Sequence, residues 1–174
     1  MSDLNPFQLN QWISDNADKL KPPLGAETLW KDTDLMVTIV GGPNKRTDFH
    51  IDPFEEFFLQ IKGDITLRIQ EHGEARDVIV REGDVFMLPP YVPHAPTRPA
   101  GTVGLIAERK RHDNDPADAF TWYCEKCNHE LFHKEAFIDV LERDMPPVFE
   151  AYYGDPSNQI CDACGHVNPG RPAD

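Results

Sequence analysis

GPNKRTDFHIDPFEE at residues 42–56 and GDVFMLPPYVPH at residues 83–94 decide the fold of this chain. The first stretch contains His50 and Glu56, and the second ends at His94. Glycines and prolines beside short apolar runs indicate strands joined by tight turns. Two imidazoles and one carboxylate on separate strands can occupy one face of a metal octahedron and leave the other face open, as in non-haem iron(II) oxygenases. The sequence therefore predicts a metal site at these three residues.

The spacing of the ligands resembles the two cupin motifs, with Gly63 seven positions after Glu56 completing the first motif. A second histidine usually stands two residues after the first, where this chain has Asp52. An asparagine usually follows the last histidine by four residues, where this chain has Arg98. These departures favour three protein ligands, with Arg98 near the metal. Asp52 is either a partner of His50 or only a turn residue. A lone histidine or glutamate on a strand is usually structural, so the prediction depends on all three occurring together.

Short strands are expected from residue 28 to residue 108, separated by glycine and proline turns. This pattern, with 16 prolines in the chain, predicts an all-β cupin or jelly-roll barrel instead of a helical protein. The strands are expected at residues 35–39, 56–61, 64–69, 77–80, 85–88 and 102–108. A short N-terminal helix should begin with Asn5 as its N-cap and Pro6 at its first position, and end before Lys21.

A smaller C-terminal extension is expected after the barrel. Residues 109–119 are polar and read as a linker, so the predicted division is a barrel at 1–112 and an extension at 113–174. A short helix is expected at residues 146–153, begun by its prolines.

Two C-x2-C pairs form the second predicted metal site, at Cys124, Cys127, Cys161 and Cys164. Two such knuckles can close a tetrahedral thiolate site for zinc or a rubredoxin-like iron. Four thiolates leave no open coordination position, so a structural role is favoured over catalysis. Our hypothesis is that this site stabilises a C-terminal segment whose own core is too small.

The bulk composition excludes several classes of protein. A net charge of −13 argues against nucleic-acid binding, even through a cysteine ribbon, because phosphate contacts need clustered lysine and arginine. No apolar run approaches the roughly 20 residues of a membrane span. The N-terminus lacks the pattern of a signal peptide, so the expected location is cytoplasmic, where cysteines serve as metal ligands more often than as disulfides.

Three charged residues are the candidates for handling a substrate. Arg46 precedes His50 by four positions and Arg98 follows His94 by four, so an even offset along a strand would point each toward the metal. An arginine fork suits a carboxylate, although most arginines on a barrel of short strands are exposed. Glu108 ends an apolar strand, where a buried carboxylate could act as acid or base.

Several short stretches of sequence extend the resemblance from the cupin motifs to one family. The sequence resembles the 3-hydroxyanthranilate 3,4-dioxygenases, and the resemblance spans about residues 7–171. It is carried by Leu20-Lys21-Pro22-Pro23, Val40-Gly41-Gly42-Pro43-Asn44, Arg46-Thr47-Asp48, His50, Glu55-Glu56-Phe57-Phe58, Glu82-Gly83-Asp84, Leu88-Pro89-Pro90, Val92-Pro93-His94, Glu108-Arg109 and Trp122-Tyr123-Cys124.

The resemblance implies a catalytic Fe2+ on His50, Glu56 and His94, and substrate or oxygen contacts from Arg46, Arg98 and Glu108. It also implies a rubredoxin-like iron on the four cysteines, a homodimer, and O2-dependent ring opening of a small aromatic substrate in tryptophan degradation. In one departure, the family usually has an asparagine just after Gly25, where this chain has Ala26 and Glu27. The rival interpretations are another cupin enzyme, such as a different ring dioxygenase or an isomerase, and a cupin that binds ligand without catalysis.

Overall fold

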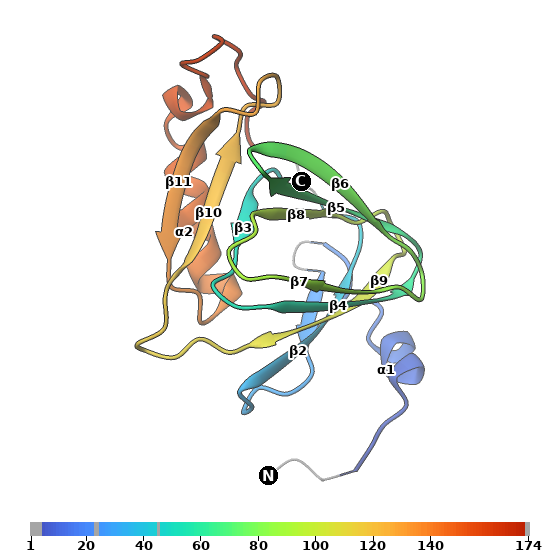
Figure 1. The fold of residues 1–174 in the computed structure, drawn as a ribbon. Helices are drawn as coiled ribbons and strands as arrows, with labels where there is room; N and C mark the ends of the chain where they lie inside the picture. The colour runs from blue at the N-terminus through green and yellow to red at the C-terminus, as the bar shows by residue number, and fades with distance from the viewer. Residues whose placement is uncertain (1–4, 23–24, 45, 173–174) are drawn as a thin grey trace.

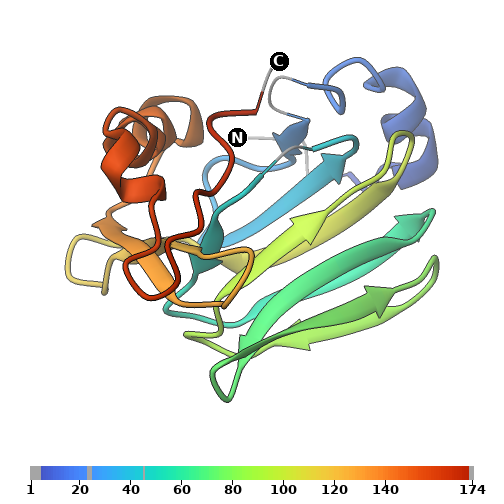
Figure 2. The ribbon, with the colours of Figure 1, turned by 90° about the horizontal axis from the view of Figure 1, so that it is seen from above.

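Two antiparallel β-sheets face one another and form a jelly-roll barrel (Figures 1 and 2). The computed structural model describes residues 5–22, 25–44 and 46–172. The five-stranded sheet has the order β1 (Ala26–Thr28), β2 (Leu35–Gly41), β9 (Val103–Arg109), β4 (Glu56–Lys62) and β7 (Val85–Leu88). The six-stranded sheet has the order β11 (Glu130–Ala136), β10 (Asp118–Tyr123), β3 (Phe49–Ile51), β8 (His94–Thr97), β5 (Ile65–Glu71) and β6 (Glu74–Val80). The expected cupin jelly roll is confirmed.

Alternation along the strands separates the barrel interior from its outer face. On β4, Glu56, Phe58 and Gln60 are buried, and the residues between them are partly exposed. The apolar part of the interior is one cluster, which comprises Phe58, Ile65, Leu67, Ile69, Val80 and Leu88. Glu56 and Gln60 are polar residues that β4 also directs inward, on either side of Phe58. The interior therefore combines an apolar cluster with buried polar side chains.

Both helices begin at positions other than those expected. α1 (Leu9–Asp15) has Gln8 as its N-cap, without a side-chain cap, so the prediction of Asn5 and Pro6 is wrong. The apolar face of α1 packs on Leu20, Ile39 and Val103, and this packing fixes the helix more strongly than any capping signal.

α2 (Leu141–Tyr153) starts five residues before the expected Pro146, and its two prolines lie inside the helix. The Asp144 carboxylate accepts the backbone N–H groups of Asp139 and Val140, both at 2.9 Å. These bonds satisfy amides that have no partner within the helix. A side chain inside the first turns therefore sets where α2 begins, and the prolines do not.

The sequence placed His50 and His94 on strands without giving their bounds, and these strands are β3 and β8. The strands β1, β10 and β11 were not expected, and the last two belong to the extension. β10 and β11 form an antiparallel pair, and β10 also pairs with β3 of the barrel, where Phe120 lies opposite His50. The predicted end of the linker at residue 119 is wrong, because Asp118 and Ala119 begin β10. The extension thus continues a barrel sheet, and the division at residue 112 stays a prediction.

α2 packs against the β10–β11 pair of the extension (Figure 1). The Tyr152 ring stacks on Trp122 with centroids 4.3 Å apart, and Phe120 and Val148 complete the buried cluster. Tyr153 reaches the barrel side through a hydrogen bond with the hydroxyl of Thr47.

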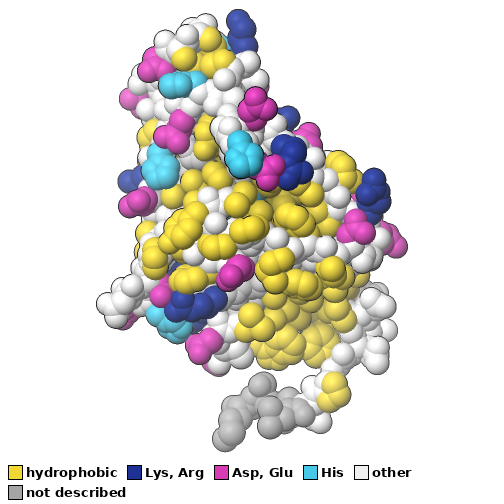
Figure 3. All heavy atoms as spheres, viewed as in Figure 1, with side chains coloured by type: hydrophobic (Ala, Val, Ile, Leu, Met, Phe, Trp, Pro, Cys, Tyr) yellow, Lys and Arg dark blue, Asp and Glu magenta, His cyan; other side chains and the backbone are white. Residues whose placement is uncertain are grey.

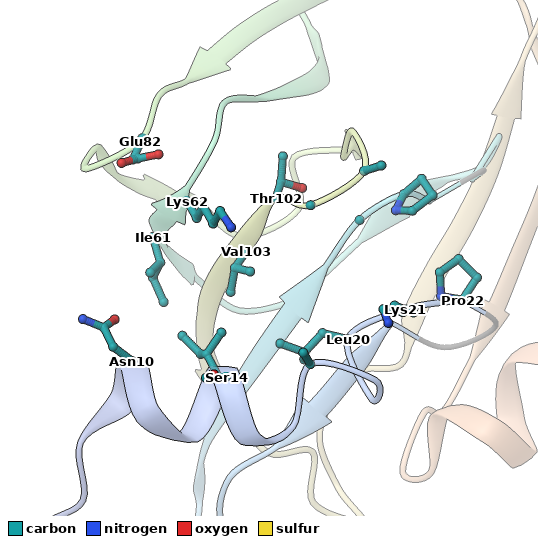
Figure 4. Close-up of a pocket in the computed structure, with 16 residues that line it drawn as sticks. Asn10, Ser14, Leu20, Lys21, Pro22, Ile61, Lys62, Glu82, Thr102 and Val103 are labelled. Atoms are coloured by element: carbon teal, nitrogen blue, oxygen red, sulfur yellow. The ribbon is translucent and has the colours of Figure 1, made fainter.

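The outer surface carries one apolar face and one apolar groove. Figure 3 shows apolar side chains gathered over the barrel beside α1, and the outward positions Leu35, Val85 and Met87 of the five-stranded sheet are exposed. A groove of about 980 Å³ lies between α1 and the barrel, lined partly by Leu20, Ile61 and Val103 (Figure 4). It contains none of the predicted site residues. Within the described part of the chain, no helix has the length and apolar character needed to cross a membrane.

Candidate metal centre

Three short strands bring the predicted ligands together inside the barrel. His50 is the central residue of β3, Glu56 begins β4 and His94 begins β8, and His50 and His94 are paired across their two strands. Glu56 Oε1 lies 3.0 Å from His94 Nε2 and 3.5 Å from His50 Nδ1. The three ligand atoms lie within 4.8 Å of one another, and all three side chains are largely buried. Two imidazole nitrogens and one carboxylate oxygen therefore converge on a single point.

Hydrogen bonds on the far side of each ring leave both convergent nitrogens free to bind a metal. His94 Nδ1 lies 3.0 Å from the carbonyl oxygen of Val92, and His50 Nε2 lies 2.8 Å from Asp118 Oδ1. A neutral imidazole carries one proton, and the far-side oxygens can hold it at Nδ1 of His94 and Nε2 of His50, so that the nitrogens facing Glu56 offer lone pairs to a metal. Among the described residues, Glu56 Oε1 is buried and accepts no hydrogen bond. A divalent cation fits this set of unused lone pairs.

The surrounding charges also fit a cation. Five carboxyl groups and three guanidinium groups surround the site, so the carboxylates would exceed the guanidinium groups by two if all were ionised: Asp48, Asp52, Glu56, Glu108 and Asp118, with Arg46, Arg98 and Arg111. Burial opposes a charged imidazole at His50, but hydrogen bonds to Asp118 and Glu56 raise its pKa to about 10. The barrel interior therefore favours positive charge at this point.

Arg98 reaches the interior as expected and is almost completely buried. Its Nη1 lies 3.4 Å from Gln60 Oε1, and its backbone N–H donates to Asn44 Oδ1 at 2.8 Å. Burial lowers the pKa of Arg98 to about 10, although the charge of Glu56 opposes the change. Gly104 faces this guanidinium, and a Cβ there would lie 2.9 Å from Arg98 Nη1. Arg98 is thus a desolvated cation in a space that a glycine keeps open.

Arg46 is held by its neighbour Asp48. Its Nε lies 3.1 Å from Asp48 Oδ1, and its Nη2 makes an ion pair with the other carboxylate oxygen. Asp48 is fully buried, whereas the Arg46 side chain is 31 % exposed. Arg46 therefore stands at the edge of the site.

Glu108 lies on β9 directly opposite Glu56 on β4. Its carboxylate is within 4.8 Å of those of Glu56 and Asp52. Burial, and then the negative charge of Glu56, raise the pKa of Glu108 to about 8. A carboxyl group with such a pKa can hold or release a proton near neutral pH.

Asp52 is not the partner of His50. Its Oδ1 accepts the backbone N–H of Phe54 at 2.7 Å, which makes it a turn residue, and its Oδ2 lies 2.7 Å from Arg111 Nη2. The partner of His50 is Asp118, which lies in the stretch that was expected to be a linker.

The departure at Ala26 and Glu27 lies at the start of the five-stranded sheet. Ala26 is paired with Val40, and Glu27 Oε1 lies 3.5 Å from Lys19 Nζ near the surface. Glu27 therefore does not replace a polar contact at the metal centre. Pro23, which helps carry the family resemblance, lies outside the described residues.

The four cysteines converge as the spacing predicts. The Sγ atoms of Cys124 and Cys164 lie 3.6 Å apart, as do those of Cys127 and Cys161, and all four are within 4.8 Å. Tetrahedral thiolate coordination of one metal ion fits this arrangement.

The two knuckles share one backbone geometry. The N–H of Cys124 donates to the carbonyl of His129, and the N–H of Cys161 donates to the carbonyl of His166. Asn128 and Gly165, each directly after the second cysteine of a knuckle, have positive φ angles of 58° and 69°. Glycine and asparagine adopt this conformation at least cost, which explains their presence at these positions.

Comparisons with known proteins identify the family of this chain. The family model described as 3-hydroxyanthranilic acid dioxygenase matches residues 1–153. The 3-hydroxyanthranilate 3,4-dioxygenase of Shewanella woodyi is 48% identical over 98% of this chain and 90% of its own length. The protein of the same name from Ruegeria pomeroyi is 47% identical over 98% of this chain and 95% of its own length. A solved cupin-2 domain protein from Shewanella frigidimarina is 13% identical, with a TM-score of 0.47, over 56% of this chain and 92% of that one. This chain belongs to the 3-hydroxyanthranilic acid dioxygenase family.

Proposed function

We propose that the chain is a non-haem iron(II) dioxygenase that opens the ring of 3-hydroxyanthranilate with O2. The product would be 2-amino-3-carboxymuconate semialdehyde, which cyclises without an enzyme to quinolinate, a precursor in NAD biosynthesis. The observation that carries this proposal is the 48% identity to a relative of that name over nearly the whole chain. The convergence of His50, Glu56 and His94 supports it, because dioxygenases of this kind need an open metal face.

Iron(II) is the metal we assign to these three ligands. Nitrogen and carboxylate ligands with open positions are typical of iron(II) oxygenases, and the negative charge around the site suits a divalent ion. When bound, the iron would supply a place where the substrate and O2 meet and exchange electrons.

Arg98 is the residue we assign to the substrate carboxylate, with help from Arg46 at the edge of the site. A buried guanidinium gains more from a carboxylate than an exposed one does, because water does not compete for its N–H groups. Arg98 would fix the ring so that its adjacent hydroxyl and amine face the metal position. Positioning of this kind lowers the entropy cost of reaction.

Glu108 is the group we assign to proton handling. The substrate hydroxyl must lose a proton as it approaches a cation, and Glu108 lies beside the ligand Glu56. Its raised pKa lets this carboxyl group exchange a proton near neutral pH, and its deprotonated form would accept the substrate proton.

The four-cysteine site would hold a rubredoxin-like iron or a zinc ion with a structural role. The proposal is supported by the four convergent thiols and the two matched knuckles. A homodimer stays a prediction of the family resemblance, and a cytoplasmic location stays a prediction from the N-terminal sequence. The exposed Leu35, Val85 and Met87 offer an apolar face for a second copy, and four thiols used as metal ligands suit a reducing compartment.

Oxygen uptake by the iron(II)-loaded protein given 3-hydroxyanthranilate tests this function. We expect rapid uptake, incorporation of both atoms of ¹⁸O2 into the product, and loss of uptake in His50→Ala. Glu56→Gln should behave like His50→Ala, and Glu55→Gln is its matched control because the Glu55 side chain is exposed.

Two results would redirect the proposal. Iron-loaded protein that ignores 3-hydroxyanthranilate but consumes O2 with another aromatic compound would identify a different ring dioxygenase. Bound iron without O2 uptake on any compound of an aromatic panel would favour a cupin that binds its ligand without catalysis.

A further inference from the structure

Asp118 of the extension is in direct contact with a ligand of the predicted catalytic metal. It is the first residue of β10 and is almost completely buried. Its Oδ1 lies 2.8 Å from Nε2 of His50, and the His50 ring also stacks on Phe120 of the same strand, with centroids 5.1 Å apart. Nε2 therefore carries the proton, and Nδ1 of His50 faces Glu56. Strand β10 thus determines which nitrogen of His50 points into the site.

Arg111 holds Asp118 in place from the other side. Its Nε lies 3.1 Å from Asp118 Oδ2 and its Nη2 lies 2.6 Å from Asp118 Oδ1, a two-pronged contact. The same Nη2 lies 2.7 Å from Asp52 Oδ2 and 3.5 Å from Glu108 Oε2. The guanidinium is 4 % exposed, so these pairs are shielded from water. One arginine therefore joins the partner of His50 to the carboxylate that we assign to proton handling.

We infer that Asp118 and Arg111 are positioning residues of the catalytic metal centre. Asp118 fixes the tautomer and orientation of His50, so that this histidine binds the metal through Nδ1, whereas His94 binds through Nε2. Arg111 holds the Asp118 carboxylate in position through two contacts and also lies beside Glu108. The metal-binding part of this inference rests on geometry alone, and the effect on Glu108 rests on the proposed function.

The charge of Asp118 is central to the expected effect. An ionised carboxylate on the far side of an imidazole makes the metal-facing nitrogen a stronger donor. The Asp118→Asn variant keeps the shape of the side chain and an accepting oxygen but removes the charge. The new amide also leaves Arg111 with one fewer carboxylate in a buried position.

Cobalt(II) affinity tests the positioning role without requiring turnover. The protein should carry zinc in the four-cysteine site and be freed of catalytic metal with a chelator before titration. We expect the Kd for cobalt(II) to rise about 10- to 100-fold in Asp118→Asn, the range for loss of a partner of a metal-bound histidine. Asp77→Asn is the matched control, because Asp77 also pairs with an arginine, Arg68, but is exposed. Thiolate-to-cobalt absorption would reveal any exchange at the cysteines.

The histidine tautomers are a second readout, because they would not change if Asp118 had only a structural role. In zinc-loaded protein labelled with ¹⁵N-histidine, we expect His50 to be protonated at Nε2 and His94 at Nδ1. The His50 N–H resonance should move in Asp118→Asn and in Arg111→Lys, and the His94 resonance should not, because its partner is the carbonyl of Val92.

The outcomes separate this inference from the proposed function. Equal cobalt(II) affinity in wild type and Asp118→Asn, or a His50 protonated at Nδ1, would overturn the positioning role even if wild type consumes O2. Opposite tautomers and weakened cobalt(II) binding would support it even if wild type has no activity on 3-hydroxyanthranilate. Should Asp118→Asn fail to fold, the wild-type tautomers and the Arg111→Lys variant decide the question.

Discussion

Glu56 and Glu108 are directly paired across strands β4 and β9, with carboxylate oxygens within 4.8 Å inside the barrel. Like charges at opposed positions destabilise a sheet, and burial adds to the cost. The raised pKa of Glu108 is the sign of this cost. The fold therefore keeps Glu108, the group that we propose for proton handling, close to the candidate metal ligand Glu56 at the expense of stability.

The first prediction concerns the pH dependence of stability in the metal-free protein. Glu108 has a pKa of about 8 in the fold against an ordinary value near 4.5, so the native state keeps a proton that the unfolded state releases. Stability should therefore fall as pH rises from about 4.5 to about 8, by on the order of a few kcal/mol. Chemical denaturation across this range should show a clearly smaller decrease in Glu108→Gln. Identical pH profiles for the two proteins would contradict the assignment.

The second prediction concerns substrate binding by Arg98. Arg98→Met removes a buried, charge-assisted contact worth about 1.5–3 kcal/mol, so kcat/KM should fall about 10- to 100-fold. Iron content should stay unchanged, because Arg98 is not a ligand. Arg68→Met, which removes an exposed arginine, is the control. An unchanged kcat/KM in Arg98→Met would remove Arg98 from the substrate site.

The third prediction concerns the space beside that guanidinium. Gly104→Ala would place a methyl group 2.9 Å from both Arg98 Nη1 and Gln60 Oε1. One of these buried groups must then move, so we expect KM to rise several-fold while iron binding persists. The comparison of KM and iron content in Gly104→Ala and wild type checks this. A KM in Gly104→Ala equal to that of wild type would show that Arg98 tolerates the displacement.

The fourth prediction concerns the four-cysteine site. Cys124→Ser with Cys161→Ser removes one ligand from each knuckle, and structural metal sites contribute their binding free energy to folding. The melting temperature should drop, and the catalytic site should still bind iron. Thermal unfolding and metal analysis of the double variant measure both effects. Full retention of stability would sink the idea that this site stabilises the extension.

The convergence of the three candidate metal ligands was predictable because each residue occupies its own position in a spaced motif. His50, Glu56 and His94 required no knowledge of strand pairing, since the glycines and prolines around them already indicate strands and turns. Arg98 was predictable as a departure from the usual motif. Its burial and its contact with Gln60 were not, because they depend on the partner strands.

Asp118 and Arg111 could not be found from the sequence. Both stand in a polar stretch that resembles a linker, and their roles arise only when β10 pairs with β3. The strands β3 and β8 are three and four residues long, too short for a period to be recognised. The predictions of the two helix starts were wrong for a similar reason. The packing of α1 and, in α2, the hydrogen bonds to the Asp144 side chain outweigh the local capping signals.

Strand β10 carries Asp118 at its first residue and is followed directly by Cys124. A shortened protein ending near residue 112 would lose the hydrogen-bond acceptor of the candidate ligand His50. Keeping β10 alone would not be enough, because Phe120 and Trp122 of this strand are buried against Val148 and Tyr152 of α2. For protein engineering, a smaller version must therefore retain α2 together with β10.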